Sequence, residues 1–231
     1  MFEINLKSLI YVKFQEDASP VIQITMILLG ATGSGKSSAG NILLKKYTKD
    51  QRFETSCFAK SETKDSKIIR ADNSMTTETI QKQFKVGIID TPAIPDSGHD
   101  DKNIENKMKQ AKDLSSSGQV VYLLCIPATA ITKYFTKDVD YYKKFFTGFD
   151  DSTIVVFTRC DQFKNENNKT FNGVQAMENN KNLKKFKRHI TLSEKLSDEE
   201  IEDAIKTLIN HIDLIYITKT SCWQTIKTLW S

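Results

Sequence analysis

The chain has 231 residues, a formal net charge of +4 and 27% charged residues. This length suits one α/β domain, and the composition excludes an intrinsically disordered chain. The charge is too small to indicate nucleic-acid binding, and the four scattered cysteines lack metal-ligand spacing, so we expect buried thiols in a reducing cytoplasm.

The order of predicted elements alternates strands with helices. Residues 1–20 form an expected N-terminal extension, residues 21–218 the main domain and residues 219–231 a C-terminal tail. Runs of β-branched and aliphatic residues bounded by turn formers predict strands; they lie at 21–29, 67–70, 84–90, 119–126, 152–158 and 189–193. Helices are predicted after residue 36, at 104–114, 136–149 and 197–217, and within 164–188. This alternation predicts a mainly parallel sheet covered on both faces.

The first strand runs directly into a glycine-rich loop. Gly30, four further residues, then Gly35, Lys36 and Ser37 match G-x-x-x-x-G-K-[ST] without a gap. Glycines let backbone N–H groups turn toward phosphate oxygens, and the following helix N-terminus adds partial positive charge. Lys36 would contact the β- and γ-phosphates and Ser37 would ligate Mg²⁺. The alternative is a glycine-rich turn with a surface lysine, but the strand–loop–helix order favours a phosphate loop.

Two later strand ends carry carboxylates. Asp90 ends the strand at 84–90, where an acid can hold Mg²⁺; a helix-capping role is the alternative. Asp161 follows the strand at 152–158, where it can accept the N1–H and N2–H groups of guanine, a donor pair that adenine lacks. The stem of Arg159 could cover the base, although a solvated turn is the alternative interpretation.

These motifs together resemble a known family. The segments GATGSGKSSAGN, IIDTP, ITKYFTKDVDYYKKFF and VVFTRCD look like those of the AIG-type GTPases, also called GIMAP or immunity-associated nucleotide-binding GTPases. The resemblance runs from about Val21 to the last helix. It implies a three-layer α/β P-loop GTPase domain that binds GTP or GDP with Mg²⁺.

The resemblance also implies roles for individual residues. The phosphate loop corresponds to Gly30, Ala31, Thr32, Gly33, Ser34, Gly35, Lys36, Ser37 and Ser38. Thr63 best matches the switch I threonine that senses the γ-phosphate and Mg²⁺, with Ser61 or Thr55 as alternatives. Ser193 and Glu194 stand in the last guanine loop, where the family usually carries asparagines.

One departure from the family pattern bears on hydrolysis. The pattern D-T-P-G reads D-T-P-A here, so Ala93 replaces a mobile glycine that donates its N–H to the γ-phosphate. The next residue, Ile94, cannot orient a water as the glutamine of Ras-like GTPases does. We therefore expect a switch with weak GTPase activity, with His99 as the candidate for a catalytic side chain.

The same resemblance implies homodimers or larger assemblies formed through the GTP-bound domain. There are two alternatives to a GTPase switch. One is a nucleotide-locked scaffold with negligible hydrolysis, and the other is a P-loop ATPase or kinase. A peripheral membrane or protein contact is also compatible with the basic and aromatic segments near the C-terminus.

Overall fold

The computed structural model describes residues 21–48, 50–55, 65–76, 83–93, 102–115, 118–131, 135–163 and 170–229. Its centre is a six-stranded sheet in the order β2-β3-β1-β4-β5-β6. The strands are β1 (Ile22–Leu29), β2 (Lys67–Thr76), β3 (Gln83–Asp90), β4 (Gln119–Pro127), β5 (Thr153–Thr158) and β6 (His189–Thr191). Neighbouring strands pair in parallel except β2, which is antiparallel to β3. The predicted α/β fold with a mainly parallel sheet is confirmed.

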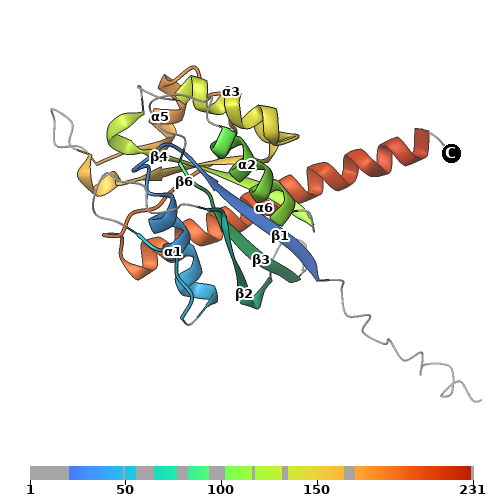
Figure 1. The fold of residues 1–231 in the computed structure, drawn as a ribbon, viewed down its shortest axis with the longest axis horizontal. Coiled ribbons are helices and arrows are strands. Elements are labelled where there is room, and N and C mark those ends of the chain that lie inside the picture. Colours follow the sequence, from blue (N-terminus) through green and yellow to red (C-terminus); the bar gives the residue numbers. More distant parts are fainter. Residues whose placement is uncertain are drawn as a thin grey trace, which may run out of the picture.

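Helices cover both faces of this sheet (Figure 1). They are α1 (Lys36–Tyr47), α2 (Lys102–Leu114), α3 (Phe135–Phe145), α4 (Phe149–Ser152), α5 (Gly173–Asn179) and α6 (Asp198–Leu229). Two short 3₁₀ turns, η2 (Ala128–Ala130) and η3 (Cys160–Gln162), follow β4 and β5. Gly148 adopts φ 65° and separates α3 from α4, within the single helix expected at 136–149.

The core has two layers because each central strand is buried on both sides. In β1, Ile24, Met26 and Leu28 belong to the cluster formed with α1 and α6. The alternate residues Ile27 and Leu29 belong to the cluster formed with α2 and α3. A strand covered on both faces needs apolar residues at every position, which explains the continuous apolar run in the sequence.

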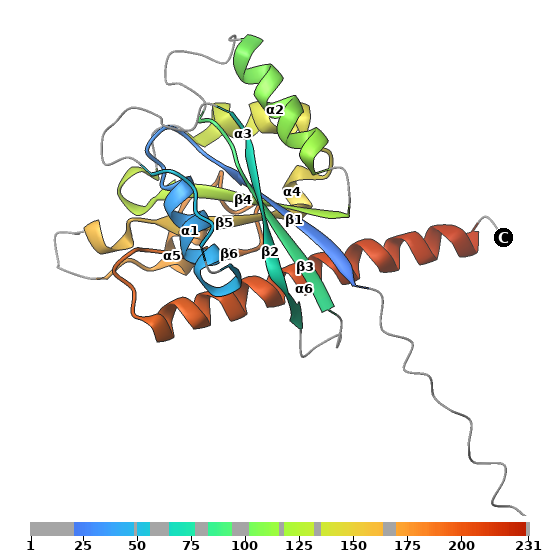
Figure 2. The ribbon, with the colours of Figure 1, turned by 60° about the horizontal axis from the view of Figure 1, so that its bottom comes forward.

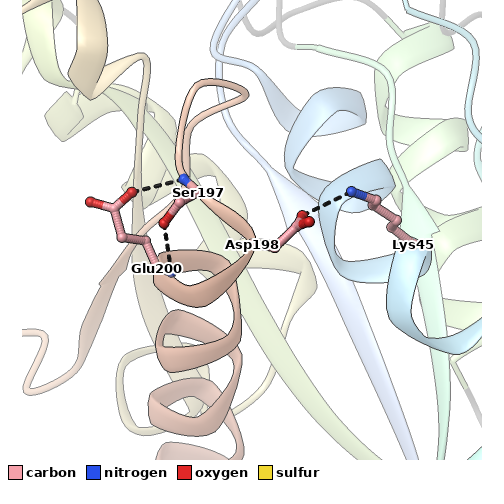
Figure 3. Close-up of polar contacts among 4 residues, drawn as sticks. All are labelled: Lys45, Ser197, Asp198 and Glu200. Carbon is pink, nitrogen blue, oxygen red and sulfur yellow. Dashed lines mark hydrogen bonds and ion pairs between the residues drawn. The ribbon is translucent and has the colours of Figure 1, made fainter.

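The last helix begins with a capping box and continues past the sheet. The Ser197 hydroxyl accepts from the Glu200 N–H at 3.2 Å, and the Glu200 carboxylate accepts from the Ser197 N–H at 2.8 Å (Figure 3). Lys45 of α1 pairs with Asp198 at 3.1 Å, which joins the two helix ends. These contacts fix the loop between β6 and α6.

The other end of α6 extends beyond the body of the domain (Figure 2). The helix was expected to end at Ile217 but runs to Leu229, so the predicted end was wrong. The sequence after 217 contains no proline or glycine to stop it. The predicted division between domain and tail at residue 218 falls inside this helix and stays a prediction, as does the extension at 1–20. Within the described parts of the chain, every helix is too short or too polar to cross a membrane.

Candidate nucleotide-binding site

The parallel strands bring the predicted site residues to one edge of the sheet. β1 leads into Gly30, β3 ends at Asp90, and β5 leads into Arg159. Ligands of open α/β sheets bind outside these strand ends. The tertiary structure therefore joins segments that lie far apart in the sequence.

The loop from Gly30 to Lys36 has the backbone of a phosphate cradle. Gly33 and Gly35 adopt φ values of 72° and 81°, and Gly35 is the N-cap of α1. A Cβ on Gly35 would lie 3.2 Å from Cβ of Thr158, so the glycine also permits close packing on β5. The Thr158 hydroxyl donates to the Ser34 carbonyl at 2.7 Å. Because this backbone turns around the helix N-terminus, it is suited to an anion.

Lys36 lies inside this loop. Its Nζ donates to the carbonyls of Gly30 at 3.0 Å and Ala31 at 3.2 Å, and the residue is 6% exposed. Burial lowers the pKa of Lys36, while the nearby Asp90 carboxylate acts in the opposite direction. The ammonium is thus held where it can exchange loop carbonyls for phosphate oxygens.

A hydrogen bond joins Ser37 of α1 to Asp90 of β3. The Ser37 hydroxyl donates to Oδ2 of Asp90 at 2.6 Å, and Asp90 is 1% exposed. Hydroxyl and carboxylate oxygens are hard ligands that suit Mg²⁺, and such sites complete their coordination with phosphates and waters. The residues present therefore fit the expected ion. Thr63, the third expected ligand, lies outside the described residues.

A pocket of about 410 Å³ opens next to the phosphate loop. It is lined by Gly35, Ser38, Ala39, Ile42, Thr55, Thr158, Arg159, Asp161, Gln162, Leu192, Ser193, Glu194 and Lys195. Arg159 has φ 54° and is the only non-glycine residue with positive φ in the part of the chain that the structure describes. Its Nη2 lies 4.0 Å from where a Cβ on Gly33 would stand, so the guanidinium spans from β5 to the phosphate loop. Sparsely populated backbone of this kind often marks a functional site.

Asp161 is oriented by the loop that follows β6. The Ser193 hydroxyl donates to Oδ1 of Asp161, and the Lys195 ammonium lies 3.4 Å from Oδ2. The hydrogen bond from Ser193 is the main reason that the pKa of Asp161 lies below its usual value. The carboxylate is therefore held in its ionised form at the wall of the pocket, where its oxygens can accept hydrogen bonds.

The sequence profile of the AIG1 family matches residues 24–225, which is most of the chain. The chain belongs to the AIG1 family. The predicted membership is confirmed. No curated protein sequence matches the chain.

One solved structure similar to the chain is titled "Structure of methanosarcina barkeri Roco2 RocCORdC bound to GDP". The similarity has a TM-score of 0.49 and 15% sequence identity, and it covers 84% of this chain and 50% of the other. The AIG1-family chain thus spans half the length of that structure.

The structure of this AIG1-family protein unites most of the predicted site residues. Ser38, Arg159, Asp161, Ser193 and Glu194 line one pocket. Ala93 follows β3 after Thr91 and Pro92, and it is 8% exposed. His99 lies outside the described residues. The role of every one of these residues in binding or catalysis stays a prediction.

Sequence reasoning missed three contributors to the site: Thr158, Lys195 and Tyr142. Thr158 precedes the recognised Arg159, and Lys195 follows Glu194, so proximity to a motif was an available signal. Tyr142 lies within the segment ITKYFTKDVDYYKKFF, which served for the family resemblance. Its hydroxyl accepts from the Gly30 N–H at 2.9 Å, a contact between residues 112 positions apart that no local pattern reveals.

Proposed function

We propose that this protein binds GTP and GDP with Mg²⁺ and hydrolyses GTP slowly. The observation that carries the proposal is the placement of two halves of a site at one edge of the sheet. One half is the loop around Lys36 with the Ser37–Asp90 pair. The other half is the pocket that contains Asp161 and Ser193. Membership of the AIG1 family supports guanine-nucleotide binding.

In this proposal each half of the site has a separate task. The loop amides and Lys36 hold the phosphates, and Asp161 accepts from the guanine edge while Arg159 flanks the base. Ser37 and Asp90 hold Mg²⁺, which would neutralise charge on the phosphate oxygens when bound. Adenine lacks the paired donors that Asp161 requires, so ATP binds much more weakly.

Slow hydrolysis follows from the residues after Asp90. Ala93 does not have a positive φ, and its side chain makes the backbone at this position less mobile than a glycine, as in the family pattern, would be. The sequence then offers Ile94, which has no polar atom for a water. We expect turnover of about 10⁻⁴ to 10⁻² s⁻¹, the range of GTPases that act without an activating partner. His99 and Thr63 remain candidates for completing the site.

We also propose that a second copy supplies the missing catalytic group. A domain that lacks a water-orienting side chain gains turnover when a partner contributes one. Turnover per molecule then rises with protein concentration and reaches a plateau when the dimer is saturated. A cytoplasmic location and a peripheral membrane contact stay predictions.

Competition binding tests the nucleotide assignment. GTP and GDP should displace a fluorescent GDP analogue, whereas ATP should not do so at a hundredfold higher concentration. Asp161→Asn should shift the preference toward xanthine nucleotides, whose C2 carbonyl can accept from an amide. Equal displacement by ATP would favour the ATPase or kinase alternative and overturn the guanine assignment.

Hydrolysis is tested by single-turnover assays over a wide protein dilution series. Turnover that rises with concentration supports assembly, and fast turnover independent of concentration contradicts it. Undetectable turnover at every concentration, with nucleotide still bound, identifies the locked scaffold instead. The same series with His99→Ala shows whether that histidine contributes.

A further inference from the structure

The first backbone donor of the phosphate loop is enclosed in the protein core. Gly30 is buried and follows the last residue of β1 that pairs with β4, Leu29 opposite Leu124. A Cβ at Gly30 would lie 2.5 Å from the Cys125 carbonyl oxygen. Gly30 also lines a pocket of about 130 Å³. Its buried N–H needs a hydrogen-bond partner, because an unpaired buried amide is costly.

That partner is the side chain of Tyr142 on α3. The Tyr142 hydroxyl accepts from the Gly30 N–H at 2.9 Å, and Tyr142 is fully buried. Its ring stacks on Phe149, with centroids 6.1 Å apart and planes at 29°, and meets Tyr141 edge-on. Burial raises the pKa of Tyr142 well above its ordinary value, so the hydroxyl stays neutral. Aromatic packing thus fixes the oxygen that holds Gly30.

The same glycine is held at its other end by Lys36. The Gly30 carbonyl accepts from the Lys36 ammonium at 3.0 Å. In the proposed function, Lys36 turns toward the phosphates and shares or gives up this contact. In this arrangement the Gly30 amide stays bonded to Tyr142, and the later amides of the loop face the phosphates. The bond to Tyr142 is therefore the contact that keeps the start of the loop in place after the lysine is engaged.

We propose that Tyr142 is a positioning residue for nucleotide binding. Its hydroxyl accepts from the Gly30 N–H and so holds the start of the phosphate loop in place. The proposal rests on the proposed nucleotide-binding function. A loop that is already in its binding conformation loses less entropy when it binds, and its complex dissociates more slowly. Because the loop serves phosphates common to both nucleotides, GDP and GTP should be affected by the same factor.

The chain offers a matched control for this hydroxyl. Tyr122 on β4 lies in the same apolar cluster and its ring also contacts Phe149, with centroids 5.2 Å apart. Its hydroxyl donates to the Thr147 carbonyl at 3.3 Å, away from the phosphate loop. Tyr142→Phe and Tyr122→Phe each remove one hydroxyl from the same aromatic layer. They differ in whether Gly30 loses its partner.

The experiment compares dissociation of fluorescent GDP and GTP analogues from the full chain and both variants, together with thermal unfolding. Tyr142→Phe should speed dissociation of both nucleotides roughly tenfold, the effect of a buried amide that loses its partner. Tyr122→Phe should leave dissociation within about twofold of the parent chain. Equal effects of the two variants, or a lower unfolding temperature with unchanged dissociation, would overturn the proposal.

Hydrogen exchange separates this proposal from the proposed function. In nucleotide-free protein, Tyr142→Phe should increase exchange of the peptide containing Gly30, and Tyr122→Phe should not. This result is readable even if the parent chain binds no nucleotide, an outcome that would refute the proposed function alone. If Tyr142→Phe does not fold, 3,5-difluorotyrosine at position 142 keeps the shape but weakens the acceptor. It should give a smaller change in the same direction, and unaltered exchange and dissociation would count against Tyr142.

Discussion

Replacement of Ser193 by alanine should weaken guanine recognition without removing the residue that reads the base. In the structure the Ser193 hydroxyl donates to Oδ1 of Asp161, and Ser193 is 4% exposed. Alanine removes the donor and leaves a small buried gap, while Asp161 keeps its weaker contact with Lys195 at 3.4 Å. The carboxylate then has more rotational freedom and must be ordered by the ligand.

The size of this effect follows from the exposure of the partners. A hydrogen bond to a charged group contributes about 1.5–3 kcal/mol when well shielded. The Asp161 side chain is 19% exposed, and the Lys195 pair is largely solvated, so the lower end of that range applies. We expect GTP affinity to fall roughly tenfold, which corresponds to about 1.4 kcal/mol. Ser193→Thr keeps the hydroxyl and should retain most of the affinity.

The change should also alter the pH dependence of binding. The pKa of Asp161 is lowered in the folded protein, chiefly by the Ser193 hydrogen bond. Its ionised form therefore stabilises the fold above the unfolded-state pKa, and that contribution is lost as the pH falls through the folded-state value. Without Ser193 the folded pKa rises toward its ordinary value. The acid limb of GTP binding should move to higher pH.

Titration calorimetry with GTP at several pH values measures both effects. Ser197→Ala is the matched control, because it removes a serine hydroxyl four residues away that caps α6 but does not contact Asp161. It should lower the unfolding temperature by a few degrees, as loss of a cap costs about 1 kcal/mol, and leave the GTP/ATP ratio unchanged. Unaltered GTP affinity in Ser193→Ala, or the same loss in Ser197→Ala, would refute the positioning role of Ser193.

Four further predictions concern the phosphate loop, the residues after β3 and the first helix. Lys36→Ala should reduce binding of GDP and GTP alike, whereas Ser37→Asn should disfavour GTP more than GDP because it disturbs the Ser37–Asp90 pair. Equilibrium binding with and without Mg²⁺ measures these affinities, and normal affinity in both variants would contradict the proposed site. Thr158→Val removes the hydroxyl that holds the Ser34 carbonyl and should speed GDP release severalfold in a dissociation assay, with Thr153→Val as a control at the other end of β5. Ala93→Gly should make the backbone at position 93 more mobile and change the rate of single-turnover GTP hydrolysis. Identical rates would show that backbone mobility at this position does not limit turnover. Gly40→Ala should destabilise the fold by about 1–3 kcal/mol in thermal unfolding, despite the higher helix propensity of alanine, because the added Cβ would lie 2.7 Å from Leu28 Cδ1.

Local sequence predicted the parts of the fold that depend on local chemistry. The central strands are apolar runs because they are buried on both sides. Their positions could therefore be predicted from the sequence to within a few residues. The capping box at Ser197 and the left-handed turn at Gly148 also depend on local chemistry, because caps and left-handed turns favour a few residue types. The end of α6 was predicted wrongly, since no breaker residue marks it.

The sequence by itself also determined the family and the phosphate-loop motif, because the spacing of Gly30, Gly35 and Lys36 is set by the geometry of one strand–loop–helix unit. Only the tertiary structure decided which distant side chains support that unit. Ser193 reaches Asp161 from the loop after β6, and Tyr142 reaches Gly30 from α3, which packs on the face of the sheet opposite α1. These contacts depend on how the parallel strands pair in the sheet and how α3 packs on it. Neither the strand order nor the helix packing is encoded within a short window of residues.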